Sequence, residues 1–181
     1  MSGERVRTYT GDAWYLHASG AWLVDPTNLT LTKKGAAVMG GGLSRAVRER
    51  FPEIDVRYGA IISERIVPGL TVGYPADMTG LTRPLLFAAQ EERILLCPVK
   101  LDWHAPARLD LIEIALAELG DWVAASPTVE IALPHIGCGL GGLDWAVDVR
   151  PLVRDWLRAM TPDIRGRIII VSADKTPATV A

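Results

Sequence analysis

The sequence has few of the residues that hold metal-binding or disulfide-rich domains together. Only two of its 181 residues are cysteine, Cys97 and Cys138, and they form no CxxC pair. Its three histidines show no HxxxH spacing and have no carboxylate at the spacing of a metal ligand. This scarcity excludes a disulfide framework and argues against a structural metal, so we expect reduced thiols and no metal site.

Long apolar runs and a strong net charge are also absent. No apolar run is long enough to cross a bilayer, and the opening residues MSGERVRTYTGD lack the apolar core of a signal peptide. We therefore expect a cytoplasmic protein with no membrane partner. The net charge of −2 disfavours a broad electrostatic grip on nucleic acid, although a local basic patch stays open.

The composition that remains is that of an ordinary globular domain, with 49% apolar and 22% charged residues. A chain of 181 residues buries one good core but is short for two domains. We therefore predict a single domain over residues 1–181, with a loose tail from about residue 173. The sequence does not indicate an oligomeric state.

Strand-like and helix-like segments alternate along the chain. Apolar strands are predicted at 21–25, 93–99, 129–133 and 167–171, helices at 43–51, at 108–123 and from an N-cap at Asp144 to about 156, and a β-hairpin at 64–75. Apolar strands separated by helices indicate an α/β fold with both sheet faces covered. Ligands of such folds bind at the carboxyl ends of the strands, where the candidate site residues therefore lie.

The stretch HIGCGLGGLDW, residues 135–145, follows one predicted strand and leads into a helix. Gly137, Gly139 and Gly142 satisfy G-x-G-x-x-G, a spacing that lets backbone N–H groups approach a phosphate at a helix N-terminus. The alternative is a tight turn, for which one or two glycines would suffice. No acidic residue follows at the distance expected of a dinucleotide-binding βαβ unit, so a conventional Rossmann site is disfavoured.

A second glycine cluster, Gly40, Gly41 and Gly42, immediately precedes the helix at 43–51. No GK[ST] follows it, so a nucleoside triphosphate P-loop is not supported. Alone, this cluster is equally well read as a flexible loop before a helix. Two glycine loops, each ahead of a helix, are better explained together by a ligand that carries two phosphates.

Three polar residues outside the glycine loops are further candidates: Lys100 and Asn28 follow predicted strands, and Asp12 lies in TGDAW near the N-terminus. Lys100 ends the strand RILLCPV, where a lysine is most often a solvated charge, but a partly desolvated lysine could supply a neutral amine to attack a sugar carbon. Trp103 and His104 could stack on a ligand or simply pack. Asn28 could bind ribose hydroxyls and Asp12 the exocyclic amine of a purine, and both are equally common in turns.

Four segments spread over nearly the whole chain resemble the macrodomain family, whose members bind ADP-ribose: YTGDAW, VDPTN, GAAVMGGGLSRAVRERFP and LPHIGCGLGGLDWAVDVRPLV. The resemblance implies a three-layer α/β/α fold with a central mixed sheet. It also implies that ADP-ribose is held by two phosphate loops, with the adenine on Asp12 and the distal ribose on Asn28. The ligand-binding residues it implies are Asp12, Ala13, Asn28, Val38, Met39, Gly40, Gly41, Gly42, Gly137, Cys138, Gly139, Leu140, Gly141 and Gly142.

Within that family, IGCGLGGLDW and LLCPVKLDWHAPARLDLIEIALAEL resemble the branch of terminal ADP-ribose protein glycohydrolase and the DarG antitoxins. The lysine matching Lys100 is catalytic there, which implies an ADP-ribosyl hydrolase that needs no metal or redox cofactor. Asp25 stands in place of the first asparagine of the family's V-N-x-x-N, and Gly141 in place of an aspartate of the glycohydrolase. The alternatives are a non-catalytic reader of ADP-ribose or a related nucleotide signal, and an ADP-ribose 1″-phosphate phosphatase. The acceptor could be protein, DNA or RNA.

Overall fold

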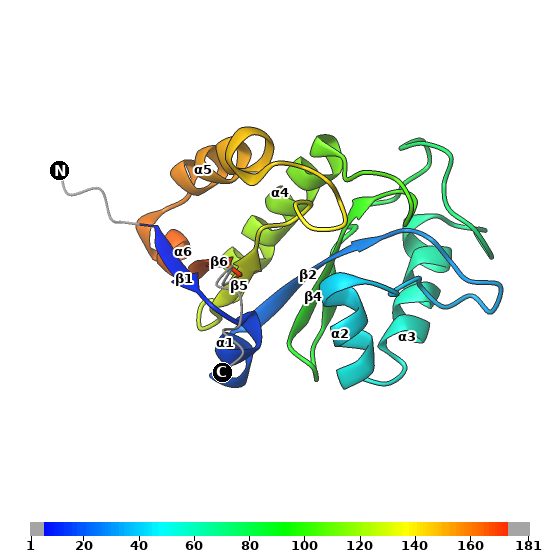
Figure 1. Ribbon diagram of the computed structural model, residues 1–181, viewed down its shortest axis with the longest axis horizontal. Coiled ribbons are helices and arrows are strands. Elements are labelled where there is room, and N and C mark those ends of the chain that lie inside the picture. Colours follow the sequence, from blue (N-terminus) through cyan, green and yellow to red (C-terminus); the bar gives the residue numbers. More distant parts are fainter. Residues whose placement is uncertain (1–5, 174–181) are drawn as a thin grey trace, which may run out of the picture.

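The computed structural model describes residues 6–173, which form one six-stranded sheet in the order β1-β6-β5-β2-β4-β3 (Figure 1). The strands are β1 (Arg7–Thr10), β2 (Trp22–Asn28), β3 (Phe87–Ala89), β4 (Ile94–Lys100), β5 (Ile131–Pro134) and β6 (Ile168–Ser172). The four predicted strands correspond to β2, β4, β5 and β6. The predicted mixed sheet is confirmed, because β3 pairs antiparallel with β4 while the other neighbours are parallel.

The parallel strands all end at one edge of the sheet. Asn28 on β2 is in register with Lys100 on β4, after a β-bulge at Thr27 and Asn28. Pro134 ends β5 and Ser172 ends β6 at the same edge. This edge therefore gathers residues that are more than a hundred positions apart in the sequence.

Helices cover both faces of the sheet, giving the predicted three layers (Figure 1). The helical segments are α1 (Ala13–Ala18), α2 (Gly42–Arg50), α3 (Ile54–Ile61), the π-helix η1 (Ile62–Ile66), α4 (Leu109–Ala125), the π-helix η2 (Trp145–Val149), α5 (Arg150–Ala159) and α6 (Pro162–Gly166). Helices α1, α2 and α3 pack on one face, and α4, α5 and α6 on the other. Asp144 caps η2 as predicted, since its Oδ1 accepts a hydrogen bond from the Val147 amide at 2.9 Å.

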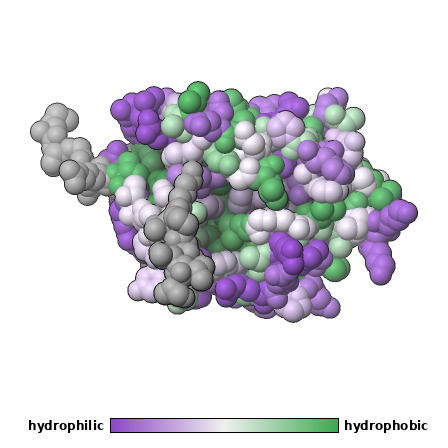
Figure 2. Space-filling model, viewed as in Figure 1, coloured by the Kyte–Doolittle hydropathy of each residue, from purple (hydrophilic) through white to green (hydrophobic). Residues whose placement is uncertain are grey.

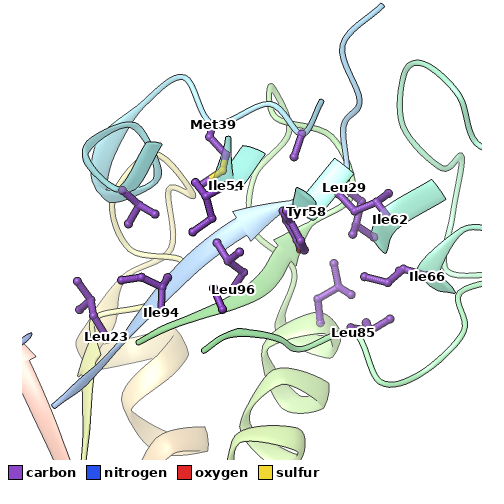
Figure 3. Packing of buried hydrophobic residues seen from close by; sticks show 14 of the residues in the cluster. Leu23, Leu29, Met39, Ile54, Tyr58, Ile62, Ile66, Leu85, Ile94 and Leu96 are labelled. Carbon is purple, nitrogen blue, oxygen red and sulfur yellow. The ribbon is translucent and has the colours of Figure 1, made fainter. Parts of the chain in front are cut away.

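Two buried clusters, one on each face, hold the layers together. Every residue of β4 is buried, and the strand sends Leu96 to one cluster and Leu95 to the other. Figure 3 shows the first cluster, which includes Leu23, Ile94 and Leu96 from the sheet and Tyr58 from α3. A fully buried aliphatic or aromatic side chain contributes roughly 1.5–3 kcal/mol, which explains why these strands are apolar throughout rather than alternating.

A prediction about local structure was wrong. No hairpin forms over 64–75: Ile62 and Ile66 are buried at helical spacing, which continues α3 into η1, and only Gly73 forms a bridge, with Leu31. From residue 174 on, the tail lies outside the described residues. Between residues 6 and 173 no helix is long and apolar enough to span a membrane.

Candidate active site

Two adjoining hollows lie at the carboxyl edge of the sheet, between α2 and η2. The inner cavity, of about 190 Å³, is lined by Pro26, Gly41, Gly42, Leu43, Ser44, Val99, Lys100, Pro134, His135, Gly137, Gly139, Leu140 and Gly141. The outer groove, of about 900 Å³, is lined by residues 11–14, 134–135, 138–139, 143–146 and 171–173, with Leu43 and Ala46. Leu43, Pro134, His135 and Gly139 line both, so a single extended ligand could occupy the two together. Figure 2 shows apolar surface gathered in a hollow near the middle of this face.

The first glycine loop brings a helix N-terminus to the inner cavity. Gly41 is the N-cap of α2 in an extended conformation, and its side-chain position is taken by the tip of Leu140 from the second loop. The first-turn amides of Gly42, Leu43 and Ser44 have no acceptor within the helix. Together with the helix dipole, these amides form a site suited to an anion.

The second glycine loop, residues 136–142, is held by backbone hydrogen bonds at its base. The Ala107 amide donates to the Gly141 carbonyl at 2.8 Å, and the Leu143 amide donates to the Gly137 carbonyl at 3.1 Å. A Cβ at Gly141 would lie 2.3 Å from the Gly137 oxygen, so folding alone requires glycine there. A Cβ at Gly139 would meet nothing within 4 Å, although Gly139 lines both hollows. The space beside Gly139 is therefore free for a ligand.

Lys100 is tied to the second loop. Its side chain is buried at the end of β4, with the residue 8% exposed, and Nζ donates to the Leu140 carbonyl at 2.7 Å and to the Trp103 carbonyl at 3.4 Å. Burial lowers the pKa of Lys100, against the opposing charge of Asp102. A neutral amine has two hydrogens and one lone pair. Two carbonyl acceptors would use the hydrogens and leave the lone pair for an electrophile.

Asp12 and Ala13 line the outer groove. Asp12 is the N-cap of α1, and its Oδ1 accepts from the Trp14 amide at 2.9 Å. In the same groove, the His135 ring is stacked on Trp145, with centroids 3.8 Å apart and planes 7° from parallel, and its Nε2 lies 3.1 Å from Ser172 Oγ. The groove thus combines aromatic surface with the carboxylates of Asp12 and Asp144, the latter engaged in capping η2, and this combination suits a purine base.

Five of the predicted ligand-binding residues line neither hollow: Asn28, Val38, Met39, Gly40 and Gly142. The Asn28 amide donates from Nδ2 to the Val38 carbonyl and accepts at Oδ1 from the Thr30 amide, both at 2.9 Å. It therefore shapes the chain that leads into the first glycine loop. The Met39 side chain is 1% exposed and belongs to the core. Trp103 and His104 also lie outside both hollows, with their rings in contact and tilted by 36° to one another.

Some cavity residues were missed by the sequence analysis, chiefly Ser44, His135 and Trp145. Ser44 lies two residues after the last glycine of the first loop, in the first turn of α2, and this position is the feature of the sequence that could have identified it. His135 precedes the second glycine loop and Trp145 follows it. Their rings meet only because the loop folds back and brings its two ends together. Among residues 6–173 no three His, Cys, Asp or Glu side chains are grouped so that they could hold a metal. The absence of a cofactor stays a prediction.

No family model matches the chain. A protein of Mycobacterium tuberculosis named DNA ADP-ribosyl glycohydrolase is 29% identical over 123 residues, which are 67% of this chain and 32% of that protein. The chain thus spans about a third of the length of the curated relatives it matches.

Solved structures extend the likeness to nearly the whole chain. The macrodomain of Mycobacterium tuberculosis DarG superposes with a TM-score of 0.64 at 25% identity, covering 93% of this chain and 98% of that one. Thermosipho africanus DarTG, in complex with ADP-ribose, superposes with a TM-score of 0.57 at 20% identity over 92% of this chain and 42% of that one. The expected fold and the resemblance to DarG are confirmed: the chain has the macrodomain fold and is similar to the macrodomains of DarG proteins.

Proposed function

We propose that this protein is an ADP-ribosyl hydrolase, which binds ADP-ribose and cleaves the bond between its distal ribose and a macromolecular acceptor. The observation that carries the proposal is the position of Lys100. Its amine is buried against the second glycine loop, inside the cavity that the first glycine loop also lines.

Binding of the ADP-ribose moiety follows from the shape and polarity of the two hollows. The α2 N-terminus and the loop amides around Gly139 would hold the pyrophosphate. The adenine would lie in the outer groove beside Asp12, and the distal ribose would enter the inner cavity toward Lys100. The DarTG structure named above contains ADP-ribose, and its fold matches this chain, which supports the choice of ligand.

The chemistry proposed for Lys100 is nucleophilic substitution at the anomeric carbon. The Nζ lone pair forms a bond to that carbon while the bond to the acceptor breaks, and the acceptor leaves with the electron pair and takes up a proton. Water then displaces Nζ and releases ADP-ribose with the lysine regenerated. This sequence uses no metal or redox cofactor, so turnover should be unchanged by a chelator.

For the acceptor, we propose a DNA base. The support is the activity named for the relatives, DNA ADP-ribosyl glycohydrolase. Among the arginines of α2 near the first loop, Arg45 pairs with Glu49, and Arg50 lies over the Trp14 ring and keeps its charge. A cytoplasmic, antitoxin-like role is part of the same proposal and rests on the same relatives.

A second candidate is a non-catalytic reader of ADP-ribose. The observation that favours it is the 2.7 Å hydrogen bond from Lys100 to Leu140, which would give this lysine a purely structural task. Both candidates share the binding site and differ only in whether Lys100 reacts.

The test offers ADP-ribosylated DNA, ADP-ribosylated protein and ADP-ribose 1″-phosphate side by side to the wild type and to Lys100→Ala, with ADP-ribose binding measured by calorimetry. Release of ADP-ribose from DNA by the wild type alone supports the hydrolase. Tight binding without turnover supports the reader, and phosphate release from the third substrate supports a phosphatase. Lys33→Ala, an exposed lysine outside both hollows, is the matched control. No binding at any concentration would contradict every one of these functions.

A further inference from the structure

Asp25 is a fully buried carboxyl group directly behind the inner cavity. It lies on β2 next to Pro26, which lines that cavity, and its exposed fraction is 0%. Its Oδ1 accepts a hydrogen bond from Ser44 Oγ at 2.8 Å, and its Oδ2 has no hydrogen-bond partner among the described residues. None of the ion pairs within residues 6–173 includes it. A buried carboxylate with one neutral donor is poorly stabilised.

The groups around Asp25 supply no compensating charge. Tyr58 on α3 and Cys97 on β4 are buried, and burial raises the pKa of both, so both are neutral at neutral pH. The other ionisable groups on elements packed against β2 are Lys100 at the end of β4, Tyr15 and His17 on α1, and Arg45, Arg48, Glu49 and Arg50 on α2. No hydrogen bond joins any of them to Asp25 in the described structure, and β5 carries no ionisable side chain.

Ser44 connects this buried carboxyl group to the cavity. Ser44 lines the inner cavity from the first turn of α2, and its hydroxyl has only one proton to donate. When Asp25 is ionised, Ser44 Oγ donates this proton to Asp25 Oδ1 in a hydrogen bond, so that the serine can only accept a hydrogen bond from a ligand in the cavity. When Asp25 is protonated, it can donate to Ser44 Oγ. The serine proton is then free for Pro26 O, 3.3 Å away, or for a phosphate oxygen in the cavity.

We propose that Asp25 is a positioning residue of the phosphate site, which through Ser44 sets whether the cavity offers a donor or an acceptor to the ligand, so that binding of ADP-ribose takes up a proton at Asp25. The inference rests on the proposed binding of ADP-ribose. Charge repulsion also favours protonation of Asp25 when the ligand binds. The pyrophosphate anion and an ionised Asp25 would repel each other across Ser44.

Asp25 changes its ionisation state near neutral pH. Burial raises the pKa of Asp25 to about 7, with the Ser44 hydrogen bond opposing the shift. The two phosphates of ADP-ribose stay ionised throughout neutral pH, so a proton taken up on binding must go to the protein. Ligand affinity should therefore fall as pH rises above the pKa of free Asp25, by up to about tenfold per pH unit.

Calorimetric titration of the wild type with ADP-ribose tests this without any substitution. Measured in two buffers of different protonation enthalpy, binding at about pH 8.5 should take up close to one proton, and binding at about pH 6 should take up almost none. Zero uptake at the higher pH, with clear binding, would overturn the inference and leave the proposed function intact. No binding heat at either pH would instead contradict the proposed function.

Two substitutions assign the proton to its residue. Asp25→Asn mimics the neutral acid, so it should bind ADP-ribose with little pH dependence and no proton uptake. Ser44→Ala should bind more weakly than wild type at about pH 6 and with an equally flat pH profile, since the responding donor is gone. In His135→Gln, which removes the imidazole of the same cavity, the uptake should persist. If Asp25→Asn keeps the proton uptake, the assignment to Asp25 is wrong.

Discussion

Lys100 Nζ lies 2.7 Å from the backbone carbonyl oxygen of Leu140, so the end of β4 is bonded to the tip of the second glycine loop. Leu140 in turn extends its side chain over Gly41 of the first loop. One lysine therefore contacts, directly and through one residue, both loops that enclose the inner cavity. Its removal has two separable consequences, one for the loop and one for chemistry.

Lys100→Ala should abolish ADP-ribose release while weakening ADP-ribose binding by less than about tenfold, because one lost hydrogen bond costs about 1 kcal/mol. Turnover and calorimetry on the same preparation measure the two effects. Lys33→Ala should leave both unchanged. A Lys100→Ala protein that still turns over every substrate of the wild type would contradict the nucleophile assignment.

The rate at saturating substrate should rise with pH. Nucleophilic attack needs the neutral amine, and burial lowers the pKa of Lys100 from its ordinary value of 10.5. The rate should therefore level off at a lower pH than an exposed lysine would allow. A rate that falls as the pH rises toward about 10 would argue that Lys100 acts in its charged form, as a donor rather than a nucleophile.

Gly139 and Gly141 form a matched pair within one loop. Gly139→Ala should leave the free energy of unfolding nearly unchanged, since its Cβ meets nothing, but should weaken ADP-ribose binding at least tenfold. Gly141→Ala should lower stability by roughly 1–3 kcal/mol, because its Cβ would collide with the Gly137 carbonyl. Urea unfolding and calorimetry of both variants check this. Unimpaired binding by Gly139→Ala would remove that residue from the site.

The sequence located the long strands and helices and both glycine loops, because continuous apolar runs and glycine clusters are local signals. It failed where a signal depends on distant partners. The three-residue β3 exists only through pairing with β4, and the first residues of 64–75, up to Ile66, pack as the end of a helix. Local pattern cannot tell these cases from a hairpin.

The second glycine loop also shows that a local sequence pattern cannot assign roles that depend on distant contacts. From sequence, the glycines of HIGCGLGGLDW look equivalent, and their number indicates a phosphate cradle. In the structure Gly141 is needed to fold the loop, and Gly139 is left for the ligand. Asn28 was predicted to bind ribose, but its amide is engaged within the chain entering the first loop. Whether a residue of the loop serves folding or ligand binding depends on which backbone atoms lie next to it in the folded chain, and the local sequence does not show this.

Asn28→Ala should therefore act mainly on the first loop. Loss of the hydrogen bonds to Val38 and Thr30 should lower the free energy of unfolding by about 1–3 kcal/mol. Asn28→Asp, which keeps the acceptor for Thr30 and loses the donor to Val38, should cost less. Urea unfolding ranks the two. If both variants match the wild type in stability and lose only ligand affinity, the ribose contact is the main role of Asn28.

Asp25→Asn should stabilise the protein at high pH. The folded pKa of Asp25, about 7, lies above its unfolded value of 3.8, so the native state binds the proton more tightly. Stability from this group is greatest at low pH and is lost as pH rises through 7. Relative to Asp25→Asn, the wild type should lose roughly 2 to 3 kcal/mol between pH 5 and pH 8. Urea unfolding at the two pH values measures the difference.

The control for this comparison is Asp121→Asn, which removes an exposed carboxylate from α4. All other ionisable groups are common to the three proteins, so their pH dependence cancels when each variant is compared with the wild type. The gap for Asp121→Asn should stay constant with pH, while the gap for Asp25→Asn widens. A constant gap for Asp25→Asn would mean that Asp25 is ionised in the native state at both pH values. The space behind Ser44 would then have to stabilise the anion, and the coupling of this carboxyl group to the phosphate site would lose its physical basis.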